Sequence, residues 1–278
     1  MKTRKKKFKK ENCGPFKREN KFTCYNTKTL HKLKNKYNQI YVDKKIHSNE
    51  PKHIWLSLKD GLQDKCNSES CWVNVLGETE DIKKITFSPK KPDSWRKNPT
   101  TWLSNFDIDD VMEQYEHYFP EFKFLGPSPI DFDAVLSNNE CVWEELCKFN
   151  LQEYIDKGIK YIGICFNLDH HDEPGSHWVT SFIDIPGHHI YYFDSTGDPS
   201  PKEVKRLVMR VMQQGNIHHM KFKFHENSPF VHQHSNTECG MYSLYFIIYM
   251  LLYRNFKIFK TRRIPDEEMK YLRTILFN

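Results

Sequence analysis

Apolar and polar residues follow two different spacings along the chain, and these divide it into expected helices and strands. In the first part, residues 28–37 and 54–62 are typical of helices. Residues 107–118 predict another helix, and residues 141–157 predict one that ends near Gly158. The first half of the chain is therefore expected to be mainly helical.

Strand-like segments follow in the second half. Residues 160–168 form an apolar strand candidate. Residues 176–184 and 189–195 read as two further strands, and the short segment 185–188 between them contains Pro and Gly. This arrangement predicts a β-hairpin, in which the start of the first strand lies beside the end of the second.

Helices and one more strand complete the pattern. Residues 201–214 predict a crossover helix, with Pro201 near its start and Gly215 just past its end. A strand is expected at 218–225, and the apolar run 241–253 predicts a buried central helix. This mixture favours an α+β fold, with helices packed on a short sheet.

A change of composition near residue 88 indicates two parts. Residues up to about 87 are rich in Lys and Asn, whereas residues 88–99 contain three prolines, few apolar residues and many charges. Such a segment is typical of an exposed connection. We therefore expect a helical N-terminal arm over residues 1–90, with a disordered basic tail at 1–12, and a core domain over 91–278.

The net charge of +6 is unevenly distributed, because residues 1–10 hold seven Lys or Arg residues. This block can contact nucleic acid or an acidic surface, although a solvated tail is the commoner case. It lacks the apolar stretch of a secretory signal, and the run 241–253 is too short to span a membrane. The chain has no glycine-rich phosphate loop, which argues against a nucleotide-using enzyme.

The chain contains eight cysteines, an ordinary density for 278 residues. Their spacing forms no small-domain disulfide framework, so reduced thiols in a cytosol-like compartment are expected. Cys66 and Cys71 form a C-x4-C pair, with Cys13 and Cys24 upstream. A zinc site in the arm is conceivable, but small buried or surface thiols are favoured over it.

Candidate chemistry centres on Cys239, which lies directly before the apolar run 241–253 and six residues after Gln233. A cysteine in the first turn of a helix feels the positive end of the helix dipole, which favours the reactive thiolate. The Gln233 amide can donate a hydrogen bond to a developing oxyanion. A buried unreactive cysteine and an ordinary loop amide are the alternatives.

A thiolate that hydrolyses amides also needs a base and a group that orients the base. His177 opens the first hairpin strand and Asp194 ends the second, so the two side chains can meet. Several other histidines lie nearby in sequence, and most of them are expected to be surface or loop residues. A metal cage is disfavoured because adjacent histidines point to opposite faces of a strand. Capping of a turn is the alternative for Asp194.

Taken in order, His177-Trp178, the strand-ending Asp194 and the run from Gln233 to Cys239-Gly240 resemble the active-site motifs of the adenain and Ulp1 class of cysteine proteases. A closer resemblance is to the polyprotein-processing proteases of African swine fever virus and other large DNA viruses. One departure is Asp194, where the swine fever enzyme has asparagine. The resemblance extends over most of the chain and is carried further by residues 66–71, 103–109 and 263–269, and less diagnostically by 22–25.

The resemblance implies a fold and a role for each site residue. The fold would be a short mixed sheet packed with helices, with the catalytic cysteine at the N-terminus of a central helix. Cys239 would be the nucleophile, His177 the base and later the acid, and Asp194 its orienter. Gln233 and the backbone N–H of Cys239 would hold the oxyanion. Two further residues, Trp178 and Asn105, would contact substrate, and no cofactor is implied.

The resemblance also implies a substrate, namely viral structural polyproteins cleaved after Gly-Gly during virion maturation. The enzyme would then act in the host cytoplasm and in the virion. A protease that removes ubiquitin-like modifiers is the main alternative, since the same site serves both tasks. An inactive adaptor that binds nucleic acid is disfavoured because all four active-site positions are intact. A requirement for an activator stays open.

Overall fold

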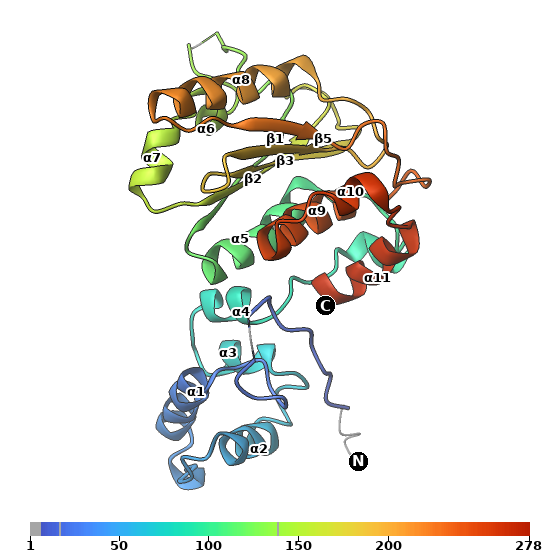
Figure 1. Cartoon of the computed structure of the whole chain (residues 1–278). Helices are drawn as coiled ribbons and strands as arrows, with labels where there is room; N and C mark the ends of the chain where they lie inside the picture. The colour runs from blue at the N-terminus through green and yellow to red at the C-terminus, as the bar shows by residue number, and fades with distance from the viewer. Residues whose placement is uncertain (1–6, 17, 138) are drawn as a thin grey trace. The chain divides into compact units, whose positions relative to one another are not determined.

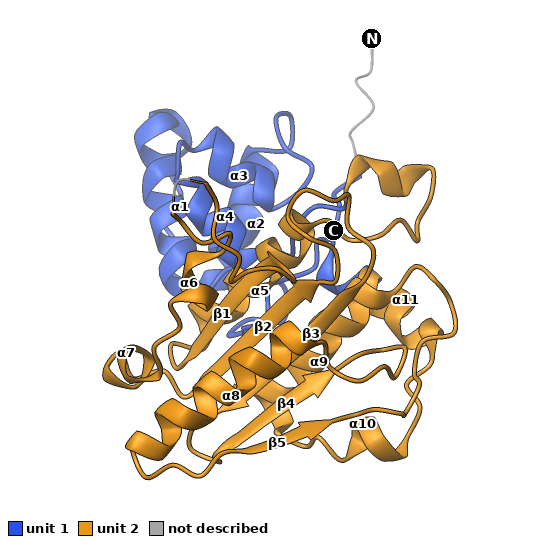
Figure 2. Cartoon of the chain, turned by 90° about the horizontal axis from the view of Figure 1, so that it is seen from above, with its two compact units in different colours: residues 1–91, 274–278 blue, residues 92–273 orange. Residues whose placement is uncertain are grey.

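The computed structural model describes residues 7–16, 18–137 and 139–278. Residues 1–6, half of the expected basic tail, lie outside the described residues. The chain forms two compact units, one of residues 1–91 with 274–278 and one of residues 92–273 (Figure 2). The expected core domain ran to residue 278, whereas the structure assigns the last five residues to the first unit. Asn278 explains this, because its side chain bonds to the backbone of Asn12 and Ser88.

The first unit is a small helical body. Its helices are α1 (Thr27–Ile40), α2 (Pro51–Gly61), α3 (Ser70–Val75) and α4 (Glu80–Thr86), with a 3-10 turn η1 (Val42–Lys44). The Asn26 side chain caps α1 by accepting from the Thr29 N–H. Fully buried Trp72, Leu30 and Ile54 belong to its apolar core. The two helices expected in this region are thus present.

Two disulfides lie in this unit, Cys13–Cys24 and Cys66–Cys71, and a third, Cys141–Cys147, lies in the second unit. The expectation of reduced thiols was therefore wrong for six of the eight cysteines. Only Cys165 and Cys239 are free. The arm cysteines considered as zinc ligands pair with one another, and the described residues contain no cluster of metal-binding side chains.

The second unit is built on a five-stranded sheet in the order β1-β2-β3-β4-β5. Its strands are β1 (Phe122–Pro129), β2 (Tyr161–Asn167), β3 (Trp178–Asp184), β4 (His189–Phe193) and β5 (Lys223–Glu226). The two outer pairs are parallel and the inner pairs are antiparallel, so the sheet is mixed. The expected hairpin is β3 and β4.

Helices cover both faces of this sheet. In Figure 1, α8 (Lys202–Ile217) lies on one face, whereas α9 (Cys239–Tyr253) and α5 (Asn105–Tyr118) lie on the other. Gly163 in β2 allows the close approach of α9, since a Cβ there would lie 2.8 Å from Ile247 Cγ2. None of the described helices is long and apolar enough to cross a membrane.

Two short helices follow α9, namely α10 (Ile258–Thr261) and α11 (Asp266–Leu276). The helix expected over 141–157 is instead split into α6 (Glu144–Cys147) and α7 (Leu151–Asp156), with the Asn150 side chain capping the second.

Three further sequence expectations need correction. Gly215 does not end its helix but lies buried inside α8, where an added Cβ would lie 2.5 Å from the Phe222 ring. The strand expected from residue 218 begins only at Lys223. The segment 88–99 is not fully exposed, because it contains the 3-10 helix η2 (Asp93–Arg96), in which Trp95 is buried.

Candidate active site

Cys239 begins the apolar helix α9, and its free thiol is buried, with 2% of the residue exposed. The backbone is packed tightly at the next position, since a Cβ on Gly240 would lie 3.0 Å from Leu103 Cβ. A glycine after the cysteine therefore lets the start of α9 approach the segment before α5. The first turn of a helix has free N–H groups and the positive end of the helix dipole, and Cys239 lies in that turn.

His177 and Asp194 meet at one end of the β3–β4 hairpin. His177 directly precedes β3 and Asp194 directly follows β4, and Thr180 pairs with Phe193 in the register between them. The His177 Nε2 lies 2.8 Å from Asp194 Oδ1. The structure thus brings together two residues that the hairpin pattern predicted would meet.

The imidazole of His177 is held in its charged form. Burial lowers the pKa of His177, but the hydrogen bonds with the Asp194 carboxylate and the Cys239 thiol outweigh it and raise the pKa to about 10. Since Nε2 is engaged by Asp194, Nδ1 is the nitrogen available to the sulfur. Cys239, His177 and Asp194 are therefore arranged in series, as a thiolate–imidazolium pair with an orienting acid requires.

Asp194 is fixed from two further directions. Its Oδ1 accepts from the N–H and the hydroxyl of Thr196, at 2.8 and 2.7 Å, so this residue both caps a turn and contacts His177. Its backbone is bracketed by fully buried Asn227, whose Oδ1 accepts from the Asp194 N–H and whose Nδ2 donates to the Asp194 carbonyl. Asn227 was not anticipated from the sequence.

Gln233 is oriented by the residue that follows Asp194. The Ser195 hydroxyl donates to Gln233 Oε1 at 2.8 Å, and the Gln233 backbone N–H donates to the Ser195 carbonyl at the same distance. Gln233 Nε2 donates one hydrogen to the Ser235 carbonyl. A primary amide carries two N–H donors, so the second remains for a substrate oxyanion.

A buried ion pair holds the residue before the cysteine. Arg273 Nε lies 2.7 Å from Glu238 Oε2, and both side chains are almost completely buried. Arg273 also donates to the carbonyls of Thr101 and Thr237 and stacks over the Trp95 ring at 4.6 Å. No sequence pattern pointed to this pair, because its members are 35 residues apart.

The comparisons with known proteins agree with this chemistry. Residues 148–278 match the family model described as the Ulp1 protease family, C-terminal catalytic domain. The chain is 31% identical to the putative thiol protease R355 of Acanthamoeba polyphaga mimivirus, over 95% of this chain and 92% of that protein. The chain belongs to the Ulp1 family of cysteine proteases.

Other similarities place this Ulp1-family protease among viral enzymes. It is 31% identical to the cysteine protease S273R of African swine fever virus over 81% of the chain and 89% of that protein. The crystal structure of that virus's pS273R protease matches with a TM-score of 0.68 and 27% identity, covering 96% of this chain and 95% of that one. The expected family, α+β fold and cysteine-protease activity are therefore confirmed.

The two expected substrate contacts lie in different surroundings in this protease. The Trp178 indole donates to the Leu103 carbonyl at 3.0 Å, and only 8% of the residue is exposed. Asn105 is exposed and begins α5, directly after the capping residue Ser104. Exposed Trp102, which the sequence reasoning passed over, donates its indole N–H to the Asn236 carbonyl in the loop that leads to Cys239.

The histidine beside Gln233 has a structural role. His232 is fully buried, its Nε2 lies 2.9 Å from the Phe259 carbonyl, and its Nδ1 accepts from the Ile264 N–H. Burial lowers the pKa of His232, so the neutral ring is favoured. Both ring nitrogens are thus used to hold the loop, which leaves His177 as the histidine that faces Cys239.

Proposed function

We propose that Cys239, His177, Asp194 and Gln233 are the catalytic residues of an endopeptidase that cleaves viral structural polyproteins after Gly-Gly. The observation that carries the proposed roles is the hydrogen-bonded series of Asp194, His177 and Cys239 at the start of α9. The specificity rests on the resemblance to viral polyprotein-processing proteases. Two residues without side chains fit a narrow slot that excludes larger ones by steric clash.

In the first half of the proposed reaction, the Cys239 thiolate attacks the carbonyl carbon of the second glycine. The oxyanion accepts hydrogen bonds from the free Nε2 hydrogen of Gln233 and the backbone N–H of Cys239. His177 in its imidazolium form gives its proton to the departing amine. The carbon–nitrogen bond breaks, and the acyl group stays on the sulfur as a thioester.

In the second half, His177 is neutral and takes a proton from water. The resulting hydroxide attacks the thioester, the thiolate leaves, and the proton on His177 restores the ion pair. Asp194 stabilises the imidazolium in both halves through its 2.8 Å contact with Nε2. Trp178 and Asn105 are proposed to contact the substrate near the scissile bond.

A second candidate substrate is a ubiquitin-like modifier. Some swine fever virus relatives carry the name SUMO-1 cysteine protease S273R, and a fission yeast relative is named NEDD8-specific protease 1. Such modifiers are folded proteins, so a demodifying enzyme would need contacts well beyond the scissile bond. A processing protease, in contrast, would accept a short peptide that contains the cleavage site.

We further propose that the enzyme acts in the host cytoplasm, at sites of viral assembly, and in the virion. The basic N-terminus would retain it there through weak contact with nucleic acid or an acidic surface, a role motivated by the charge of residues 1–10. Deleting residues 1–6 should then lower the amount of enzyme in purified particles. Unchanged packaging would refute this role.

The decisive experiment compares cleavage of a Gly-Gly-X peptide and of a ubiquitin-like fusion by the purified chain and by its Cys239→Ala variant. Loss of the nucleophile should reduce kcat by a factor on the order of 10⁴ or more. Peptide cleavage that disappears in the variant supports the processing protease. Cleavage confined to the folded fusion supports the demodifying enzyme, and cleavage that persists in the variant refutes the assignment of Cys239.

A further inference from the structure

The first unit contains a cavity of about 320 Å³ that the proposed protease mechanism does not use. This volume lies at the lower end of the range for small-molecule sites, roughly 300–1000 Å³. Its walls come from the N-terminal segment, from residues 18–24, from α2 and from Glu69. The Cys13–Cys24 disulfide joins two of these segments, so the N-terminal wall is covalently tied to the rest.

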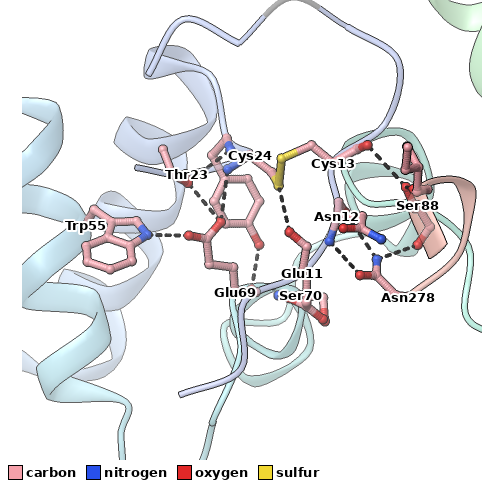
Figure 3. The surroundings of a disulfide bond; sticks show 12 residues. Glu11, Asn12, Cys13, Thr23, Cys24, Trp55, Glu69, Ser70, Ser88 and Asn278 are labelled. Carbon is pink, nitrogen blue, oxygen red and sulfur yellow. Dashed lines mark hydrogen bonds between the residues drawn. A yellow bond between two sulfur atoms is a disulfide. The ribbon is translucent and has the colours of Figure 1, made fainter. Parts of the chain in front are cut away.

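A buried carboxylate lies at the cavity. Glu69 is 7% exposed, and its oxygens accept from the Trp55 indole N–H at 2.5 Å, the Thr23 hydroxyl at 2.9 Å and the Cys24 N–H at 3.1 Å (Figure 3). Burial raises the pKa of Glu69, which shows that this position disfavours its charge. A carboxylate accepts about four hydrogen bonds, so one acceptor position remains for a donor inside the cavity.

Aromatic side chains form the apolar part of the wall. Phe8 and Phe22 both pack edge-on against Trp55, with ring centroids 6.0 and 5.9 Å apart. Lys59 Nζ lies over the Phe8 and Trp55 rings, 4.7 and 4.9 Å from their centroids. A single cation over an aromatic face contributes little binding energy, so a flat group can displace it.

The rim of the cavity is basic. Lys9, Lys10, Arg18 and Lys21 line it and are exposed. Glu11, the other carboxylate in the lining, is engaged by the backbone N–H and the hydroxyl of Ser70. With Lys59, five basic side chains outnumber two carboxylates, so the entrance attracts anions.

Three features must therefore suit one ligand, namely a cationic entrance, aromatic walls and a buried hydrogen-bond acceptor. An acidic peptide suits the entrance, but its carboxyl groups would be repelled by Glu69. A simple polyanion has no flat group for the aromatic walls. A nucleotide has a phosphate for the basic rim, a base for the aromatic side chains and base N–H groups for the carboxylate.

We infer that this cavity binds one nucleotide unit, with the base against Phe8, Phe22 and Trp55 and the phosphate at the basic rim. The unit can belong to single-stranded nucleic acid or to a free nucleotide. Stacking of bases on aromatic residues is a main source of affinity in other single-strand-binding proteins. The inference does not depend on the proposed protease function, because Cys239 and His177 do not line the cavity.

The test uses the full-length Cys239→Ala chain and a fluorescein-labelled single-stranded oligonucleotide, with binding followed by fluorescence anisotropy. Unlabelled mononucleotides and inorganic polyphosphate serve as competitors. Competition by mononucleotides identifies the free nucleotide as a ligand, whereas competition by oligonucleotides alone identifies nucleic acid. Failure of the oligonucleotide and the mononucleotides to bind overturns the inference.

Variants of the rim and the wall separate base recognition from simple charge attraction. Phe22→Leu should weaken oligonucleotide binding about tenfold through lost stacking and leave polyphosphate binding unchanged. The double variant Lys9→Ala/Lys10→Ala should weaken binding of both ligands. It should also reduce the slope of log K against the logarithm of the salt concentration by about 1–2, since about one or two fewer counterions are released on binding. The matched control is Lys44→Ala/Lys45→Ala, which removes two exposed lysines of the same unit away from the cavity.

Glu69→Gln gives the sharpest distinction, because base recognition and simple charge attraction predict opposite changes in the affinity for the oligonucleotide. Removal of a negative charge from a merely electrostatic surface should strengthen binding of every polyanion. Loss of the carboxylate acceptor should weaken oligonucleotide binding and change the preference between bases. Equal or tighter binding by Glu69→Gln, together with no effect of Phe22→Leu, overturns the inference. Thermal unfolding confirms that each variant is folded.

Discussion

The hydroxyl of Ser195 donates a hydrogen bond to Gln233 Oε1 at 2.8 Å, and this contact fixes the orientation of the Gln233 amide. Ser195 directly follows Asp194 in the chain, so one turn after β4 supplies both the proposed orienting acid and the residue that holds the proposed oxyanion donor. The hydrogen-bond partner of His177 and that of Gln233 are therefore neighbours in the same short segment.

The first prediction follows from this contact. Ser195→Ala should lower kcat on a Gly-Gly-X peptide about tenfold with little change in KM, because the amide of Gln233 is no longer held in one orientation. Gln233→Ala should have a larger effect, about 10²-fold or more, because the donor itself is lost. The control is Ser200→Ala, which removes a buried hydroxyl without a hydrogen-bond partner among the described residues. Equal kcat values for Ser195→Ala and Ser200→Ala would contradict the positioning role.

The second prediction concerns pH. The pKa of His177 is raised to about 10, so the imidazolium persists through neutral pH and kcat/KM should fall only as the pH approaches that value. Asp194→Asn removes a charge that raises this pKa and leaves the burial that lowers it, so the alkaline limb should move to lower pH. Measurement of kcat/KM from about pH 6 to 10.5 for the unmodified chain and for Asp194→Asn checks the direction of this shift. An alkaline limb at the same pH in the variant would rule out Asp194 as the partner of His177.

The same raised pKa affects stability. His177 titrates near 6.5 when unfolded and near 10 when folded, so its contribution to stability is complete below about pH 6.5 and is lost as the pH rises toward 10. The Cys239→Ala chain is not a suitable control in this urea-unfolding experiment, because the substitution removes one of the groups that raise the pKa of His177. His177→Gln, compared with the unmodified chain across this pH range, isolates the contribution. Its unfolding free energy should depend less steeply on pH.

The local parts of this arrangement could be predicted from the sequence, and the distant parts could not. His177 precedes the first strand of a hairpin and Asp194 follows the second, so the pattern of two strands and a tight turn was enough to bring them together at one end of the hairpin. Asn227 contacts Asp194 from a segment 33 residues away, and neither residue carries a pattern that indicates the pairing. Arg273 and Glu238 are a similar case, since charged residues in a sequence are usually solvated.

The strand β1 was not predicted from the sequence, and the reason lies in its own residues. β1 contains Gly126, Pro127 and Pro129, which indicate a loop because proline cannot donate to a β-ladder. The structure accommodates them because β1 is an edge strand, and its register against β2 shifts between Leu125 and Ser128. The disulfides were missed for another reason, because eight cysteines in 278 residues do not exceed the ordinary density of free thiols.

The fourth prediction concerns these disulfides. Thiol titration of the denatured chain should give two free thiols without reductant, from Cys165 and Cys239, and eight after reduction. Cys13→Ser/Cys24→Ser should destabilise the first unit by about 2–3 kcal/mol, as expected for a short loop. The Cys165→Ser variant is the control for this count. It lacks one of the free thiols, so it should give one free thiol without reductant. A count of eight without reductant from freshly purified protein would refute the three bonds.

The last prediction tests the buried ion pair next to Cys239. Arg273→Met leaves the Glu238 carboxylate buried without its partner, and breaking one side of such a pair costs about 3–5 kcal/mol of stability. The double variant Arg273→Met/Glu238→Leu removes both charges, so it should recover much of that loss, as measured by urea unfolding. Its kcat should nevertheless stay low, because Arg273 also holds the carbonyls of Thr101 and Thr237 beside the start of α9. If the double variant recovered both stability and kcat, the pair would serve folding alone and would have no part in positioning Cys239.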